Sequence, residues 1–203
     1  MRILALDVGT KRIGTAFADT ASVKIAVPRQ MIPVNGEEFA ALAQQCRRDH
    51  IDVLVSGFPR NNQGEETAQT KLVQSFIIAL SDYFVKHKLY SPLIKYQDES
   101  LTSVAAKERL SQQTSRALSF RDRRDGKIDV EAATIILQDF LDSVDYAALN
   151  QELGRHKLEQ KARSLDAART PSLSGPRESR HLASDRRHNA TSISPTYQSE
   201  RSK

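Results

Sequence analysis

The chain has 203 residues, 39% of them hydrophobic, which allows one domain with an appendage or two small domains. Its single cysteine excludes a disulfide framework and a cysteine-cluster metal site, and its five histidines show no ligand spacing, so any metal site should use oxygen ligands, which suit Mg²⁺ or Mn²⁺. The net charge of +5 lies in residues 151–203, which hold 11 Lys or Arg and 6 Asp or Glu, whereas residues 1–150 hold 19 of each sign.

The sequence carries no sign of a membrane or secretory segment. No apolar stretch approaches the length needed to span a bilayer. The first residues are strand-like and carry a charge too early for a secretory leader. We therefore expect a cytoplasmic protein without a membrane partner.

Three short strands are predicted first along the chain. Residues 3–8 form an almost continuous apolar run, which is typical of a strand covered on both faces. Residues 12–18 alternate in character and predict a second strand, and residues 23–27 predict a third that Pro28 stops. The short links between them favour antiparallel pairing.

Asp7 stands near the tip of the first strand and is followed by Gly9 and Gly14. An ionised carboxylate in an apolar run is costly unless it is paired, and a metal ion or a phosphate-bearing ligand is a common partner. Glycines remove side chains where a backbone or a ligand must come close. A simple Asx-turn explains the same Asp-x-Gly pattern without any function, so both interpretations stay open.

Helices and strands alternate in the next hundred residues. Apolar spacing predicts helices over 36–50 and 66–88 and strands over 51–56 and 93–97, with a polar loop at 60–64; Cys46 falls on the apolar face of the first helix. A helix from near Ser103, a basic loop over 114–127 and a helix over 129–144 follow. This order predicts an α/β fold with a mixed five-stranded sheet flanked by helices.

After residue 145 the apolar pattern weakens. Residues 146–169 have few apolar positions for a packed helix, and residues 170–203 are rich in Ser, Arg, Pro and Thr. We expect a domain over 1–145 and a low-complexity, disordered basic tail over 146–203.

Acidic residues stand at the ends of three predicted elements: Asp7, the pair Asp98-Glu99, and Asp129. Sites in open α/β sheets form at the carboxyl ends of strands, so these acids can converge. Clustered carboxylates need divalent cations, and two such ions are a known device for phosphodiester cleavage. Asp129 as a helix N-cap and Asp98-Glu99 as a solvated strand end are the alternatives.

A cluster of cations precedes Asp129 in the predicted loop. Cations beside an acidic metal site can hold the flanking phosphates of a nucleic acid, which makes Arg123 and Arg124 candidate substrate contacts. A solvated loop, interrupted by Asp122 and Asp125, explains the cluster equally well.

Four sequence blocks occur in order along residues 1–143: LALDVGTKRIGTAFAD, SGFPRNNQG, QDESLTSVAA and GKIDVEAATIILQDFL. With them the chain resembles the YqgF/RuvX family of pre-16S rRNA nucleases, which have a Holliday-junction-resolvase-like, RNase H-like fold. The resemblance implies Mg²⁺- or Mn²⁺-dependent nuclease chemistry, with Asp7, Glu99 and Asp129 as the catalytic and metal-binding acids.

The resemblance also implies contacts to substrate. Lys11, Arg12 and Asn61, the last in the loop 57–64, match substrate-facing positions of the family. Two residues depart from the pattern. Ser100 stands where the family usually has Arg, and Arg60 stands where an apolar residue is usual.

The leading hypothesis is a metal-dependent endonuclease, a phosphodiester hydrolase that processes the 5′ end of pre-16S rRNA in ribosome biogenesis. Resolution of Holliday junctions, with structured DNA as the partner, is one alternative, and a non-catalytic RNA-binding protein that keeps the fold is another. A two-lobed ATPase or sugar kinase is disfavoured because the chain holds one such lobe. A homodimer stays open.

Overall fold

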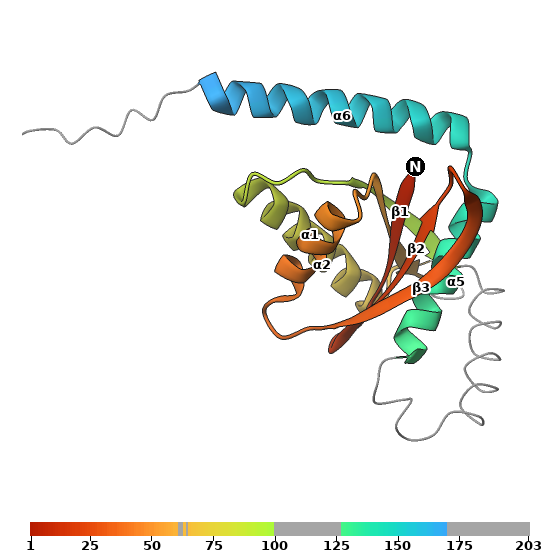
Figure 1. Ribbon diagram of the computed structural model, residues 1–203. Helices are drawn as coiled ribbons and strands as arrows, with labels where there is room; N and C mark the ends of the chain where they lie inside the picture. The colour runs from red at the N-terminus through yellow and green to blue at the C-terminus, as the bar shows by residue number, and fades with distance from the viewer. Residues whose placement is uncertain (61–62, 64, 100–126, 170–203) are drawn as a thin grey trace, which may run out of the picture. The chain divides into compact units, whose positions relative to one another are not determined.

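The computed structural model describes residues 1–60, 63, 65–99 and 127–169 (Figure 1). They contain the mixed five-stranded sheet that the sequence predicts, and its strands lie in the order β3-β2-β1-β4-β5. The first three strands pair antiparallel, whereas β4 pairs parallel with both β1 and β5. The strands are β1 (Arg2–Val8), β2 (Arg12–Asp19), β3 (Val23–Pro33), β4 (Val53–Pro59) and β5 (Leu93–Glu99).

Helices cover both faces of this sheet. The described helices are α1 (Glu38–Arg48), α2 (Ala68–Lys86), α5 (Lys127–Ser143) and α6 (Tyr146–Arg169). In β1, Leu4 and Leu6 pack in the apolar cluster shared with α1 and α2, whereas Ile3 and Ala5 pack in the cluster shared with α5. Burial on both sides explains why this strand has an almost continuous apolar run.

The third strand is longer than the sequence predicts. It runs to Pro33 and includes Pro28, which lies opposite Ala16 where the register with β2 is irregular. β3 forms one edge of the sheet. Proline is tolerated at sheet edges and irregularities because its missing N–H interrupts no central ladder there, so Pro28 does not end the strand.

The compact unit extends from Met1 to Arg169 and so includes α6. This differs from the boundary expected at residue 145. Leu149 and Leu153, four residues apart, are 2% and 7% exposed and join the cluster around α5. One buried helical turn therefore attaches a segment that is otherwise too polar to be recognised as packed.

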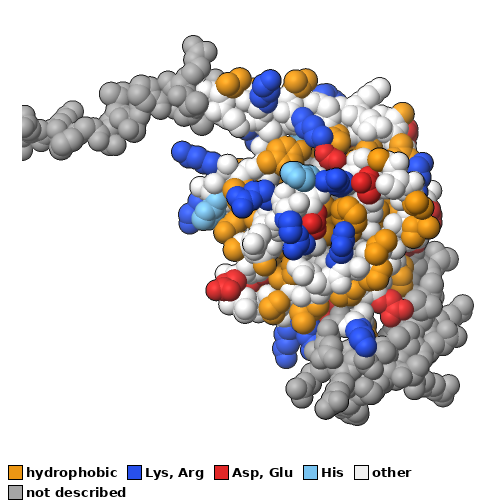
Figure 2. Space-filling view, in the orientation of Figure 1, with side chains coloured by type: hydrophobic (Ala, Val, Ile, Leu, Met, Phe, Trp, Pro, Cys, Tyr) orange, Lys and Arg blue, Asp and Glu red, His pale blue; other side chains and the backbone are white. Residues whose placement is uncertain are grey.

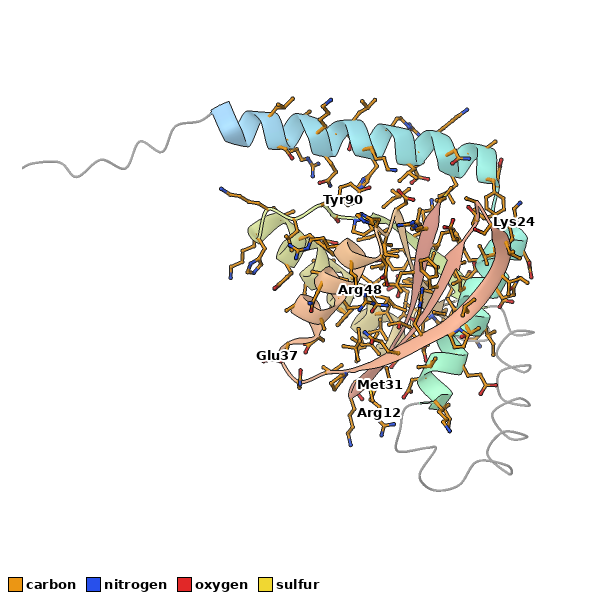
Figure 3. The ribbon with its side chains drawn as sticks, viewed as in Figure 1. Arg12, Lys24, Met31, Glu37, Arg48 and Tyr90 are labelled. Carbon is orange, nitrogen blue, oxygen red and sulfur yellow. The ribbon has the colours of Figure 1, made fainter. Side chains whose placement is uncertain are left out.

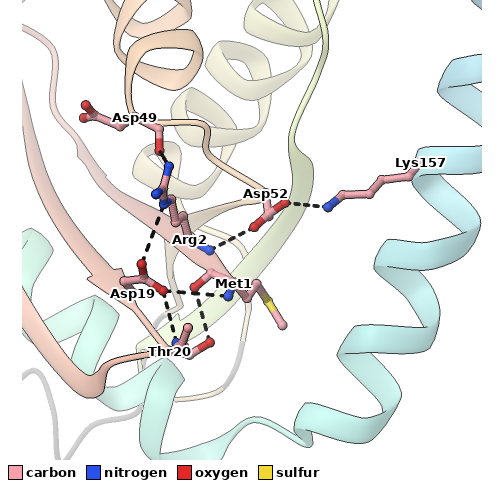
Figure 4. Close-up of polar contacts among 8 residues, drawn as sticks. Met1, Arg2, Asp19, Thr20, Asp49, Asp52 and Lys157 are labelled. Carbon is pink, nitrogen blue, oxygen red and sulfur yellow. Dashed lines mark hydrogen bonds and ion pairs between the residues drawn. The ribbon is translucent and has the colours of Figure 1, made fainter.

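Polar contacts add to this attachment (Figure 4). The ammonium of Lys157 lies 2.6 Å from Oδ1 of Asp52, and the backbone N–H of Arg2 donates to Oδ2 of the same carboxylate at 2.9 Å. Burial raises the pKa of Asp52, but the hydrogen bonds from Lys157 and Arg2 outweigh it and leave this pKa below its ordinary value. The His156 ring also contacts the carbonyl oxygen of Ser91 at 2.8 Å.

Cys46 lies in the core, on the α1 face predicted for it, and is 4% exposed. Burial raises the pKa of its thiol to about 12.

Among the described residues no helix combines the length and apolar character that a membrane crossing requires.

Candidate functional site

Asp7 lies at the edge of the sheet where the parallel strands β1, β4 and β5 reach their carboxyl ends. It is half-buried and stands next to the last residue of β1. Side chains alternate along a strand, so Asp7 shares a face with Ile3 and Ala5, which pack toward α5. Its partner across the antiparallel pairing is Gly14 of β2.

Gly14 brings α5 against this edge. A Cβ at position 14 would lie 1.8 Å from the carbonyl oxygen of Asp129 and 2.8 Å from the nitrogen of Val130. Only a residue without a side chain allows so close an approach, so the first turn of α5 rests directly on β2. Gly14 is therefore both the cross-strand partner of Asp7 and the residue that contacts the backbone of Asp129.

Asp129 is paired with a cation in this arrangement. Nη1 of Arg12 lies 3.6 Å from Oδ2 of Asp129, and the two side chains are 34% and 32% exposed. Figure 3 shows Arg12 at the end of the sheet where β2 begins. Because α5 begins at Lys127, Asp129 lies within its first turn, where the helix dipole stabilises a negative charge. The interpretation of Asp129 as the N-cap is therefore wrong.

The two acids at the end of β5, Asp98 and Glu99, occupy adjacent positions, and adjacent positions of a strand face opposite sides of the sheet. Asp98 forms an ion pair with Arg60, with 3.6 Å between Oδ2 and Nε, beside a cavity of about 310 Å³ that Gln74 of α2 also lines. Asp98 thus lies on the α2 side of the sheet, opposite the Asp7 face, and its pairing with Arg60 gives a local reason for the basic residue that departs from the family pattern.

Glu99 is the last residue of β5, in register with Pro59 of β4. One strand separates β5 from β1, which places the two backbones about 10 Å apart at this edge. The Glu99 side chain is outside the described part of the structure. Among the side chains that are described, no three His, Cys, Asp or Glu form a group that could hold a metal ion.

The hairpin between β1 and β2 lies at the same edge. The N–H of Gly9 donates to the carbonyl oxygen of Arg12 at 3.0 Å, which closes the turn, and Lys11 in this turn is exposed. Gln69 near the start of α2 donates from Nε2 to the carbonyl oxygen of Val8 at 2.8 Å. Sequence reasoning missed Gln69, because its role depends on a contact between segments that are distant in the chain.

The remaining predictions fall outside the described residues. They concern Asn61, Arg123, Arg124, Ser100, the helix expected from near Ser103 and the basic loop over 114–127.

Comparison with known proteins gives consistent matches over the first 143 residues. The family model described as "RuvX: Holliday junction resolvase" matches residues 1–143. Curated relatives named "Putative pre-16S rRNA nuclease" occur in Streptococcus uberis, 32% identical over 146 residues, and in Clostridium novyi, 36% identical over 149 residues. The matches cover 98% and 100% of these relatives but 70% and 71% of this chain.

Solved structures show a more distant likeness. Thermus thermophilus RuvC in complex with a Holliday junction substrate is 12% identical with a TM-score of 0.39, and the match covers 69% of this chain and 94% of RuvC. The yeast mitochondrial Holliday junction resolvase Ydc2 is 13% identical with a TM-score of 0.37, and the match covers 79% of this chain and 85% of Ydc2. These values are too low to transfer residue roles.

Proposed function

Because the chain belongs to the RuvX family, whose model it matches over residues 1–143, we propose that it is a divalent-metal-dependent endonuclease that matures the 5′ end of pre-16S rRNA. The relatives named as nucleases of this precursor support the substrate. The observation that carries the chemistry is the backbone contact of Asp129 with Gly14, directly across the sheet from Asp7.

The residues at this edge fit a hard divalent cation. Asp7 and Asp129 supply carboxylate oxygens, the ligands that Mg²⁺ and Mn²⁺ prefer, and we propose Glu99 at the end of β5 as the third acid. When bound, such ions supply an activated water and stabilise the leaving oxygen. Gly14 fixes the separation of the two acids, because no side chain intervenes between β2 and α5.

Arg12 and Lys11 are proposed to hold the substrate. The guanidinium of Arg12 is partly exposed beside Asp129, and Lys11 is exposed in the adjacent turn, so both can contact phosphates that flank the cleaved bond. The ion pair with Asp129 also keeps Arg12 oriented before substrate binds. Asn61, Arg123 and Arg124 stay predictions of the same kind.

Replacement of Asp7 by Asn tests the metal chemistry. The change keeps the size of the side chain and removes the charge that holds a cation, so cleavage of a 5′-extended pre-16S rRNA with Mn²⁺ should fall at least about 100-fold. Asp98→Asn is the matched control, because that carboxylate lies on the other face of the sheet. Equal cleavage by Asp7→Asn and by the unmodified chain would defeat the proposal.

A four-way DNA junction is the substrate of the second candidate function, which the description of the family model favours. Both substrates should be offered to the same preparation. Preferential cleavage of the junction would assign the site to structured DNA. Binding of rRNA without cleavage of either substrate would leave a non-catalytic RNA-binding protein.

A cytoplasmic location accords with rRNA maturation and is part of the proposed nuclease function. A homodimer is proposed as well.

A further inference from the structure

A groove of about 540 Å³ lies between α6 and the end of α2 with the segment that follows it. Its walls come from residues 85–91 on one side and from residues 157–164 of α6 on the other. Figure 3 shows Tyr90 in the segment beneath α6. α6 lies beyond residue 143, where the family match ends, so one wall of this groove is outside the matched region.

The charge of the groove has one sign. Of the ten residues that line it, Lys88, Lys157, Lys161 and Arg163 are cationic and none is acidic. Lys157 is already paired with Asp52, but the other three form no ion pair with any described residue. Figure 2 shows several Lys and Arg side chains on the face below α6, with Asp and Glu side chains between some of them. Such a concave set of uncompensated cations favours an anionic ligand.

The groove also offers an aromatic surface. Tyr90 is 45% exposed, and its ring meets the His156 ring edge-on with 6.4 Å between centroids. Cations along a groove combined with an accessible aromatic ring are the chemistry by which proteins hold single-stranded nucleic acid, through phosphates and base stacking respectively.

The groove is remote from the Asp7 edge. Lys157 and His156 contact Asp52 and Ser91, which precede β4 and β5, so α6 crosses the amino ends of these strands. β4 has seven residues and therefore spans about 20 Å from this end to the end that carries the candidate acids. A ligand that reaches both places must be extended.

We propose that this groove, named here the α6 groove, binds a single-stranded segment of the RNA substrate at a distance from the cleaved bond. The inference rests on the proposed function for the identity of the ligand. The α6 wall of the groove, residues 157–164, lies beyond the residues that the family model matches.

The variant Lys161→Gln with Arg163→Gln tests the α6 groove. Binding of the full chain to a fluorescent 20-nucleotide single-stranded RNA is measured in EDTA over a salt series, so that cleavage does not intervene. Each lost phosphate contact on a single strand should reduce the slope of log K against log salt by about 0.7, so two lost contacts should reduce it by about 1.4. Arg47→Gln with Arg155→Gln is the control with the same charge change, on exposed residues that do not line the groove.

The outcomes separate this inference from the nuclease proposal. An unchanged slope in the groove variant, with folding verified by circular dichroism, overturns the α6 groove even if the chain cleaves rRNA. A reduced slope supports the groove even if the chain cleaves nothing. Equal losses in the groove and control variants indicate a general charge effect and overturn it. The inference is also overturned if poly-glutamate displaces the fluorescent RNA as well as unlabelled RNA of equal charge does. Lys88→Gln, on the α2 side, provides the same test should the double variant fail to fold.

Discussion

At the scale of single residues, Gly14 has the largest consequence for the site. Replacement by Ala puts a Cβ against the backbone of Asp129, which cannot move aside as a flexible side chain can. The start of α5 must shift, so we expect a loss of stability of about 1–3 kcal/mol and a loss of cleavage larger than this destabilisation explains. Denaturant unfolding and cleavage assays on the same sample measure both.

Gly154 in α6 is the matched comparison. A Cβ there meets nothing within 4 Å, so Gly154→Ala should stabilise the protein by about 0.5–1 kcal/mol, because alanine loses less entropy in a helix. If both alanine variants had the same stability, the close contact at Gly14 would be refuted.

The lowered pKa of Asp52 allows a prediction of how the stability of the protein depends on pH. Its pKa is lowered from 3.8 in the folded state, so its charged form contributes stability that is complete above the ordinary pKa and is lost as the pH falls through the lowered value. Asp52→Asn should therefore cost about 1 kcal/mol at pH 7, since Lys157 is half exposed and its pairing is screened.

Thermal unfolding of Asp52→Asn and of the unmodified chain between pH 7 and pH 2.5 checks this sign. The difference between them should be constant down to about pH 4 and shrink below it. A difference that grows as the pH falls would contradict the lowered pKa.

At the scale of elements, α1 is followed by a residue with a strained backbone conformation. His50 has φ of +50° and follows the last turn, where its N–H donates to the carbonyl oxygen of Arg47 and the N–H of Ile51 donates to that of Cys46. This is a Schellman ending, in which glycine is usual because other residues are strained at positive φ. His50→Gly should raise the free energy of unfolding by about 1 kcal/mol.

His50→Ala is the control for this change, because alanine keeps the Cβ that causes the strain. Chemical denaturation of the two variants separates relief of strain from loss of the imidazole. Equal stabilities would show that backbone strain at position 50 is not the cause.

Elements with strong local patterns could be predicted from the sequence. The apolar run of β1 and the helical spacing of α1, α2 and α5 each indicated the correct type, because burial imposes a period on the sequence. The extension of β3 past Pro28 could not, because it depends on that strand lying at the sheet edge. The packing of α6 rests on Leu149 and Leu153, too few positions to give a recognisable period.

The candidate site divides in the same way. Asp7 and Asp129 were visible as acids at element ends, and the family resemblance supplied Glu99. The ion pairs of Arg12 with Asp129 and of Arg60 with Asp98 could not be predicted, because each joins segments whose approach is set by the tertiary fold. The close approach of Gly14, the cross-strand partner of Asp7, to the backbone of Asp129 depends on the tertiary fold in the same way.

At the scale of the whole molecule, α6 belongs to the folded unit although it lies beyond the family match. A chain that ends at residue 169 keeps α6 and is the reference for a shorter chain. A chain that ends at residue 145 loses the burial of Leu149 and Leu153, which contributes about 3–6 kcal/mol. Urea unfolding of the two truncations measures this difference, and equal midpoints would contradict the packing of α6.

The lone thiol of Cys46 has a practical use that follows from its burial. With its pKa raised to about 12 and almost no exposed surface, it should resist maleimide reagents while the protein is native. Cysteines introduced at chosen surface positions can therefore carry fluorescent dyes without first removing the natural one. Conversely, the rate at which a maleimide modifies Cys46 measures how often the sheet and α1 separate. The same reagent therefore reports the frequency with which the core opens.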